Sequence, residues 1–345
     1  MTESLFIFGN GLGRSIDPDY FDLKTGLKRT WDNAKLTNAD KQLILQSINK
    51  SPDNLKVLPE TEDELYNLKT IVEACAYIST FQQSIGEDWL TEHGKAFPTA
   101  INKFVHETAL TYLQRERNGN FPSDRHKPTE KFSKNLKEYI RKNGAHILTV
   151  NYDDLLYDLF TEDPLMTKYQ LRDGFFTDGF DWEKSVSRHN TTTDNNGWFM
   201  HLHGSPLFSS QKGTIRKFKR SNIPASSGEI NPHIILTHKS FKKSLIQKSP
   251  ILKSYWDMFI ELLRQNKNII LFGMSGDDDH INEAIRAYVR EDAIIRIVDW
   301  TGESDNERDK KEELWKGKLG ENRFKTENLI LLPNVQDFTD WALNS

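Results

Sequence analysis

The chain has 345 residues, of which 37% are hydrophobic, and a formal net charge of −4. Its mean hydropathy is −0.65, and no apolar run approaches the roughly 18 residues that a spanning helix needs, so we expect no membrane segment. The small net charge gives no reason to expect nucleic acid as a direct ligand. Cys75 is the only cysteine, which excludes an intrachain disulfide and a multi-cysteine zinc site. The opening residues lack a secretory signal pattern, so we expect a cytoplasmic protein.

A short apolar run over residues 5–8 predicts a buried strand, and the segment GNGLGR follows it directly. Glycine lets the backbone turn sharply and approach a pyrophosphate, whose charge suits the start of a following helix. The spacing departs from the full dinucleotide fingerprint, because arginine stands where a last glycine is needed. An ordinary tight turn is the alternative. The candidate phosphate-binding residues are Gly9, Asn10, Gly11, Gly13 and Arg14.

A long helical region separates this strand from the next. Thr61 and Glu64 have capping-box spacing, and apolar residues follow at helical spacing as far as Phe81. A second helical pattern covers residues 89–114, with Pro98 as a candidate break, and a third covers residues 128–143. This is too much helix for a simple crossover. We therefore expect residues 55–127 to form a helical insertion or subdomain beside the sheet.

The segment HILTVNYDD begins at residue 146 and predicts a second strand that ends at Val150. A helix is expected from about Asp153. Asn151 and Asp153 then lie at the carboxyl end of the strand, where ligands bind in open α/β sheets. The alternative is that either residue only caps the helix.

The segment WFMHLHGSP begins at residue 198 and predicts a third strand, ended by Gly204. Alternate residues of a strand share a face, so His201 and His203 are expected to point the same way. Such a pair can bind metal, act in acid–base chemistry or be hydrogen-bonded structure. Together with Asp153 and the acids at 277–279 it could form a mixed nitrogen and oxygen metal site.

Residues 189–197 and 209–229 predict polar loops, and residues 239–265 predict one long helix. Between residues 212 and 253 ten basic residues accompany a single acid, Glu229. This stretch is either a solvated basic face or a surface for a partner or a phosphate.

The run at residues 268–272 predicts a further buried strand, which again ends in glycines, a serine and carboxylates. Gly273 permits close approach of a ligand, Ser275 can donate to a phosphate, and Asp277 can accept from ribose hydroxyls. The alternative is that the acids only favour the positive end of a helix. Residues 293–298 and 329–332 predict the remaining strands, and the charged residues 302–318 a solvated loop or helix.

In this order, the segments GNG, TVNYD, LHGS and FGMSGDD resemble the bacterial SIR2-like family. That family is related to sirtuins and includes NAD⁺-depleting effectors of antiphage defence. The resemblance spans residues 6 to about 285, and NYD and LHGS are its most specific motifs. It implies an α/β fold, with a sirtuin-like Rossmann-type parallel sheet flanked by helices. It also implies that residues 1–345 form a single SIR2-like catalytic domain.

The resemblance also implies a role for each motif. Asn151 matches the asparagine that holds the nicotinamide ribose and a water, Asp153 the acid that follows it, and His203 the catalytic histidine. The loops at the two ends of the dinucleotide are matched by Gly9, Asn10, Gly11, Gly273, Ser275 and Asp277. The first loop departs from the family, which more often has alanine after the first glycine and serine near Gly13. His201 has no family role.

Protein-deacylating sirtuins usually carry a four-cysteine zinc module, which one cysteine cannot build. The resemblance therefore implies an NAD⁺ hydrolase, with NAD⁺ as substrate, water as nucleophile and no metal. The alternatives are an NAD-dependent deacylase or ADP-ribosyltransferase, a metal-dependent hydrolase that uses His201 and His203, and a non-catalytic NAD or ADP-ribose sensor. A free NADase poisons its own cell, so we expect control by a homo-oligomer or by an operon-encoded partner protein.

Overall fold

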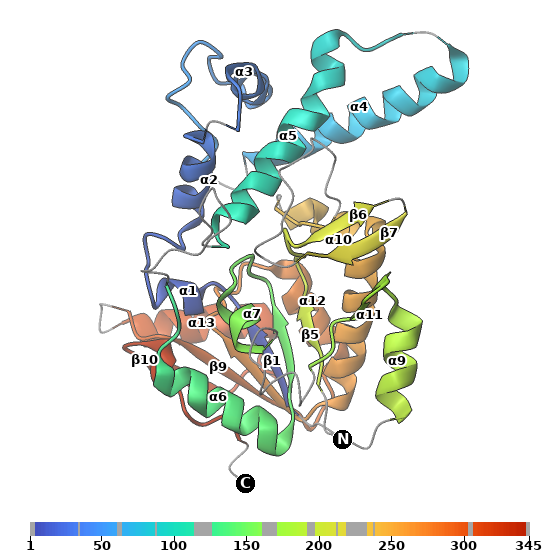
Figure 1. Cartoon of the computed structure of the whole chain (residues 1–345). Helices are drawn as coiled ribbons and strands as arrows, with labels where there is room; N and C mark the ends of the chain where they lie inside the picture. Colours follow the sequence, from blue (N-terminus) through green and yellow to red (C-terminus); the bar gives the residue numbers. More distant parts are fainter. Residues whose placement is uncertain are drawn as a thin grey trace.

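The computed structural model has two parts. One is a parallel sheet with helices on both faces, and the other is a group of helices at one end of the sheet, called the helical layer below (Figure 1). None of the described helices is long and apolar enough to cross a membrane. The structure describes residues 4–33, 35–60, 64–86, 88–113, 126–160, 171–191, 197–211, 213–218, 233–236, 239–302 and 306–342.

The central sheet has six parallel strands in the order β10-β9-β8-β1-β2-β5. Numbered along the chain, this is the doubly wound order 3-2-1-4-5-6 of the Rossmann fold. The predicted α/β class is therefore confirmed. The strands are β1 (Ser4–Phe8), β2 (His146–Thr149), β5 (Phe199–His201), β8 (Asn268–Phe272), β9 (Ile294–Trp300) and β10 (Leu329–Leu332).

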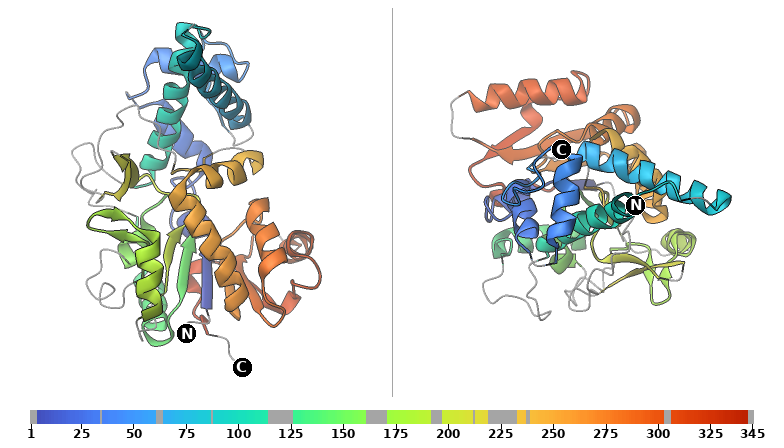
Figure 2. Two further views of the ribbon diagram at one scale, coloured as in Figure 1. Left: turned by 90° about the vertical axis from the view of Figure 1, so that its right-hand side faces the viewer. Right: turned by 90° about the horizontal axis from the view of Figure 1, so that it is seen from above.

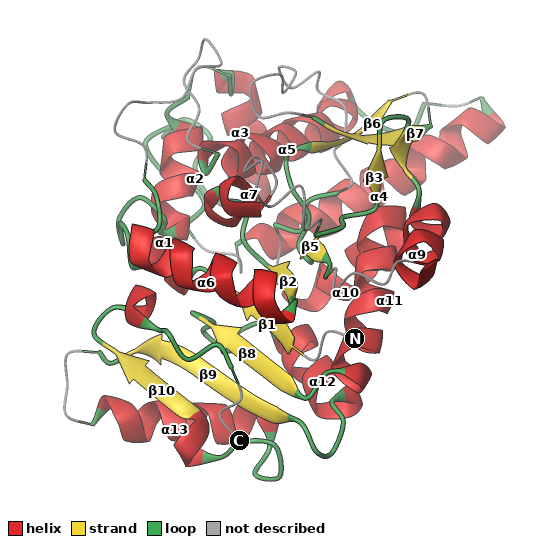
Figure 3. Ribbon diagram, turned by 60° about the horizontal axis from the view of Figure 1, so that its bottom comes forward, coloured by secondary structure: helices red, strands yellow, loops and turns green. Residues whose placement is uncertain are grey.

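Helices cover both faces of the sheet, which explains why the inner strands are continuous apolar runs. Figure 3 shows α6 (Glu130–Asn143) on one face and α13 (Glu307–Leu319) on the other. The sequence of α6 fits this position. Thr129 caps its first turn, and the side chains that it buries recur every fourth residue. These side chains are Phe132, Leu136 and Ile140.

The register of the sheet brings four strand ends to one level. Phe8 pairs with Thr149 on one side and with Phe272 on the other, and Thr149 pairs with His201. The segments that follow β1, β2, β5 and β8 therefore leave the sheet at the same edge. The strand order reverses between β1 and β8, which is the position where doubly wound folds bind ligands.

The loops after β1 and β8 touch through their backbones. The Gly9 N–H donates to Phe272 O at 2.9 Å, and the Gly11 N–H donates to Gly273 O at 2.8 Å. A Cβ on Gly11 would lie 2.5 Å from the Gly273 Cα. In addition, Gly273 has a φ of +61°, a backbone conformation that favours glycine. These glycines therefore serve the contact between the two loops.

Replacement of Gly11 by alanine is expected to lower the free energy of unfolding by about 1–3 kcal/mol, because the added methyl group meets backbone that cannot move alone. Chemical denaturation measures this change. Gly317→Ala is the matched control. Its Cβ meets no atom within 4 Å, and alanine in α13 should stabilise the protein by about 0.5–1 kcal/mol. Equal effects of the two substitutions would contradict the loop contact.

The helical layer comprises α2 (Leu23–Trp31), α3 (Asn38–Ser47), α4 (Leu65–Ile85) and α5 (Glu92–Thr111). These helices share a second apolar core, and α5 contacts the other three. Figures 1 and 2 show this layer beyond the carboxyl edge of the sheet. The layer begins earlier than residue 55, because α2 and α3 pack into the same core. Pro98 lies inside α5, so the helix is not broken there, and Thr61 lies outside the described residues.

The predicted long helix at 239–265 is in fact two, α10 (Lys239–Lys248) and α11 (Pro250–Gln265). The Ser249 side chain caps α11 and Pro250 occupies its first turn, the usual signature of a helix start. The predicted loop at 209–229 overlaps a hairpin of β6 (Phe208–Gln211) and β7 (Thr214–Lys217). The predicted loop at 189–197 overlaps the end of α9 (Trp182–Thr191).

Shorter elements complete the described fold. A second small hairpin pairs β3 (Phe175–Phe176) with β4 (Gly179–Phe180). The helices α1 (Gly11–Arg14) and α7 (Leu155–Phe160) follow β1 and β2, and α12 (Asp279–Tyr288) follows β8. The last strand is preceded by the 3₁₀ turn Thr326–Asn328 and followed by Val335–Asp337.

Candidate active site

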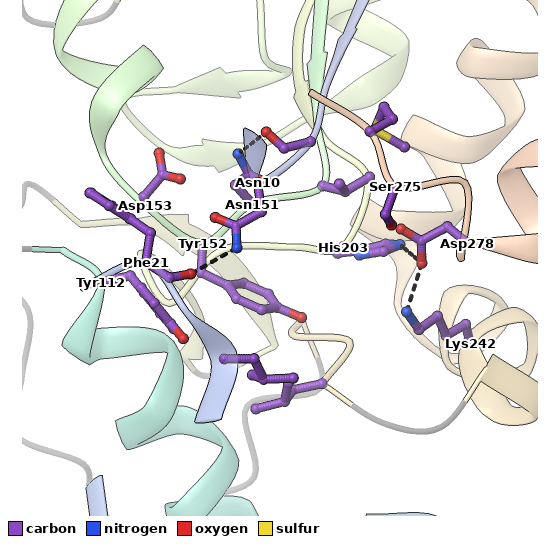
Figure 4. Close-up of a pocket in the computed structure, with 15 residues that line it drawn as sticks. Asn10, Phe21, Tyr112, Asn151, Tyr152, Asp153, His203, Lys242, Ser275 and Asp278 are labelled. Carbon is purple, nitrogen blue, oxygen red and sulfur yellow. Dashed lines mark hydrogen bonds and ion pairs between the residues drawn. The ribbon is translucent and has the colours of Figure 1, made fainter. Parts of the chain in front are cut away.

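A pocket lies between the carboxyl edge of the sheet and the helical layer (Figure 4). It collects side chains from the loops after β1, β2, β5 and β8, from the start of α2, from the residue that ends α5 and from α10. Four of the predicted motifs therefore meet in one place. The lining residues are Gly9, Asn10, Phe21, Leu23, Tyr112, Val150, Asn151, Tyr152, Asp153, His203, Leu236, Lys242, Met274, Ser275 and Asp278.

Asn151 joins the second strand to the opening glycine turn. Its side-chain Nδ2 donates to the Gly9 carbonyl oxygen at 2.9 Å, and its backbone N–H donates to Thr149 Oγ1 at 3.0 Å. The residue is 8% exposed. On the other side of the turn, Asn10 Nδ2 donates to the Phe21 carbonyl at 2.7 Å. The two asparagines therefore hold the glycine turn between β2 and the segment that leads into α2.

Asp153 is a buried carboxyl group on the same side of the pocket. One of its oxygens accepts from the Leu155 N–H at 3.1 Å, which steadies the start of α7. Burial raises the pKa of Asp153 to about 7 and the neighbouring charge of Asp154 adds to the rise, whereas the Leu155 N–H and the Asn151 side chain oppose it. The carboxyl group is thus poised to change its charge near neutral pH.

His203 lies opposite Asn151 and Asp153, on the loop after β5, and is 4% exposed. Its Nε2 lies 3.0 Å from His280 Nε2 and 3.7 Å from Asp278 Oδ1. Burial lowers the pKa of His203 to about 3, although the Asp278 carboxylate works in the other direction. The imidazole is therefore neutral at pH 7, and the same burial makes it a weaker base than a free imidazole.

The family model described as the SIR2-like domain matches residues 145–319, just over half of the chain. The chain belongs to the SIR2-like family. Domains of this family bind NAD and are typically NAD-using enzymes. The matched range contains NYD, LHGS and FGMSG, whereas the opening glycine turn lies before it. Among curated proteins, none matches the sequence.

The SIR2-like pocket contains two charged residues, Asp278 and Lys242, that were not among the predicted NAD contacts. Asp278 lines the pocket, whereas Asp277 is exposed, and the ribose contact of Asp277 stays a prediction. Lys242 of α10 donates to Asp278 Oδ1 at 2.7 Å. Burial alone would raise the pKa of Asp278, but His203 and the Lys242 ammonium together lower it below its usual value. The run of acids indicated a carboxylate at this position. Lys242 belongs to the basic stretch at residues 212–253, but the sequence did not single it out as a site residue.

His201 does not share the environment of His203, so the prediction of a common face is wrong. β5 ends at His201, and the chain turns before His203. The His201 ring packs edge-on against Phe199 and Phe208. Burial lowers its pKa to about 4. Among the described residues, the group that could hold a metal joins His203 to Asp278 and His280 and leaves His201 out.

Several residues that were predicted to contact NAD are not among the residues that line the pocket. Gly11 and Gly273 meet each other, and a Cβ on Gly13 would lie 2.7 Å from the Phe21 ring. Arg14 is exposed on α1. Ser275, by contrast, lines the pocket. The predicted ligand contacts of all these residues stay predictions.

Proposed function

We propose that this SIR2-like protein is an NAD⁺ hydrolase that cleaves the bond between nicotinamide and ribose. The observation that carries the proposal is the convergence of two buried side chains, the Asn151 amide and the His203 imidazole, in one pocket beside the Gly9–Asn10 turn. We also propose that the whole chain acts as one catalytic domain, of which the helical layer is a part.

The reaction needs no general acid to protonate the leaving group, because nicotinamide leaves as a neutral molecule from a cation. The ribose becomes oxocarbenium-like, and water adds to it to give ADP-ribose and a proton. The enzyme has to position the sugar, stabilise the developing charge and direct the water. A pocket that combines an amide, a neutral imidazole and carboxyl groups can supply these functions.

In this proposal His203 accepts a proton from the water or a ribose hydroxyl. The Asp278 carboxylate, 3.7 Å from His203 Nε2, stabilises the imidazolium that forms. A hydroxyl that reaches the same nitrogen competes with His280 for it, since the two rings share a hydrogen bond. Asn151 holds the ribose and the water, and the ionised form of Asp153 favours positive charge on the sugar.

Incubation of the purified chain with NAD⁺ and a chelator, followed by measurement of nicotinamide release, tests the proposal. Metal-independent release supports hydrolysis by this site. Activity that the chelator removes supports the metal-dependent hydrolase instead. Binding of ADP-ribose without release of nicotinamide supports a sensor. Turnover that requires an acyl or protein acceptor supports a deacylase or transferase.

Asn151→Ala is expected to fold but to lose NAD⁺ consumption, because the amide that holds the sugar is gone. Loss of the hydrogen bond to the Gly9 carbonyl should also lower the free energy of unfolding by about 1–3 kcal/mol. Nicotinamide release and chemical denaturation measure the two effects. Thr149→Val, which removes the acceptor of the Asn151 backbone N–H, should lose stability but retain activity. If Asn151→Ala consumed NAD⁺ at the wild-type rate, Asn151 would not be the residue that holds the ribose and the water.

We propose further that activity is controlled by assembly, in keeping with an effector of antiphage defence or abortive infection. The helical layer exposes large aromatic side chains around the far end of α4, which suits a contact between copies of the chain. They are Tyr77, Phe81 and Trp89, which are 77%, 42% and 58% exposed. Size-exclusion chromatography at several concentrations, with and without operon-encoded neighbours, tests for self-association and for a protein partner.

A further inference from the structure

A cluster of metal-ligating atoms lies in the wall of the pocket. His203 Nε2, His280 Nε2 and one oxygen of Asp278 all lie within 4.8 Å of one another. The two imidazole nitrogens are 3.0 Å apart, and His203 Nε2 is 3.7 Å from Asp278 Oδ1. A tetrahedral zinc ion with bonds of about 2.0–2.1 Å holds its ligand atoms about 3.3 Å apart. These two separations bracket that value, and His280 Nε2 lies within 4.8 Å of the Asp278 oxygen.

The groups also have the chemistry that zinc prefers, two imidazoles and one carboxylate. Each imidazole offers its Nε2 atom, and Asp278 offers one carboxylate oxygen. The two Nε2 atoms share a hydrogen bond, so an entering metal ion must displace the hydrogen between them. The His280 ring lies nearly parallel to Trp256, at 18° with centroids 5.3 Å apart, which fixes its orientation. The three groups therefore offer one ligand atom each from a compact cluster.

Access comes from the pocket. His203 and Asp278 both line it, so an ion entering there would keep a fourth position open towards the substrate side. Lys242 opposes binding, because its ammonium donates to the Asp278 oxygen at 2.7 Å and would repel a dication. Zinc must therefore displace Lys242 from the carboxylate, which makes the affinity of the site moderate.

We propose that zinc binds to His203, His280 and Asp278 and inhibits the enzyme by occupying the nitrogen of His203 that accepts the proton. The inhibition rests on the proposed NAD⁺ hydrolysis, whereas the binding does not. A zinc ion held here would occupy the site in competition with NAD⁺. Hydrolysis itself needs no metal in this proposal, so the ion acts as an inhibitor and not as a cofactor.

Calorimetric titration of the metal-stripped full chain with zinc chloride tests the binding without NAD⁺. One saturable site is expected. His280→Phe keeps a ring beside Trp256 but removes a ligand, and should weaken binding at least about tenfold. Lys242→Met removes the competing ammonium and should tighten binding at least about tenfold. His93→Phe, on the exposed side of α5, is the control and should change nothing.

The absence of saturable zinc binding, or equal affinity in the wild type, His280→Phe and Lys242→Met, overturns the proposal. Circular dichroism establishes that each variant is folded. If His280→Phe does not fold, Lys242→Met decides alone, because a site at this cluster must bind zinc more tightly without the ammonium. A protein that binds zinc with this pattern but releases no nicotinamide refutes the hydrolase and leaves the metal site standing.

Discussion

His203→Ala is expected to abolish NAD⁺ consumption while the protein stays folded. Removal of a positioned base costs about 10²–10⁴-fold in rate, and the residue contributes to the pocket wall more than to the apolar core. Nicotinamide release at saturating NAD⁺ measures the loss, and circular dichroism establishes that the variant is folded. Wild-type release by this variant would remove His203 from the mechanism.

The matched control is His201→Phe, two residues away. Phenylalanine suits a site whose neighbours are Phe199 and Phe208, so stability and NAD⁺ consumption should both be retained. The pair of variants also separates the hydrolase from its metal-dependent alternative. If His201 and His203 acted together on a metal, both substitutions would stop the reaction.

The strands were predictable because their burial on both faces leaves mostly apolar residues in each run. The predicted strand at residues 268–272 coincides with β8, and the other runs agree with their strands to within two residues. The convergence of the four motifs was also predictable, because parallel strands have their carboxyl ends at the same edge of a sheet. That rule places Gly9, Asn151, His203 and Ser275 around the same pocket.

Side-chain direction was not predictable from the same patterns. Three consecutive aspartates follow Gly276, and only the turn into α12 decides that Asp278 faces His203 while Asp277 faces solvent. The alternation that seemed to pair His201 with His203 holds only while a strand continues, and β5 ends between them. Lys242 comes from a distant helix, so its contact depends on tertiary packing that no local pattern encodes.

The helical layer shows a different limit. Its later helices were predicted from capping and spacing, but α2 and α3 were missed, since each is short and polar on much of its surface. Their apolar side chains, such as Trp31 and Ile44, are buried by α4 and α5, not by the sheet. Such helices are stabilised by their neighbours, so their own sequences signal them weakly.

Asp153→Asn is expected to be more stable than the wild type at pH 8, and the advantage should shrink as the pH falls. The carboxyl group has a pKa of about 7 in the folded chain against 3.8 ordinarily. Between these values the folded protein holds a proton that the unfolded chain has lost, so wild-type stability falls as the pH rises. The free energy of unfolding of the wild type falls by about 1.4 kcal/mol per pH unit between these values, and the total loss reaches about 4 kcal/mol above pH 7.

The groups that face Asp153 do not change this sign. Burial raises the pKa of Tyr20 to about 12 and that of Tyr112 well above its usual value, so both phenols stay neutral throughout the interval. Asp154 adds negative charge, which increases the cost of ionising Asp153. Asparagine has the same shape and can still accept from the Leu155 N–H.

Urea unfolding of the wild type and Asp153→Asn at pH 5, 6, 7 and 8 measures the difference between their free energies of unfolding. This difference should widen up to pH 7 and then level off. Asp277→Asn, on the exposed loop after β8, controls for the loss of a carboxylate as such. A difference that does not vary with pH would show that Asp153 is ionised at no cost. In the proposed reaction the positive nicotinamide ring favours the carboxylate, so bound NAD⁺ should offset part of the penalty, and nicotinamide release should rise with pH through the same interval.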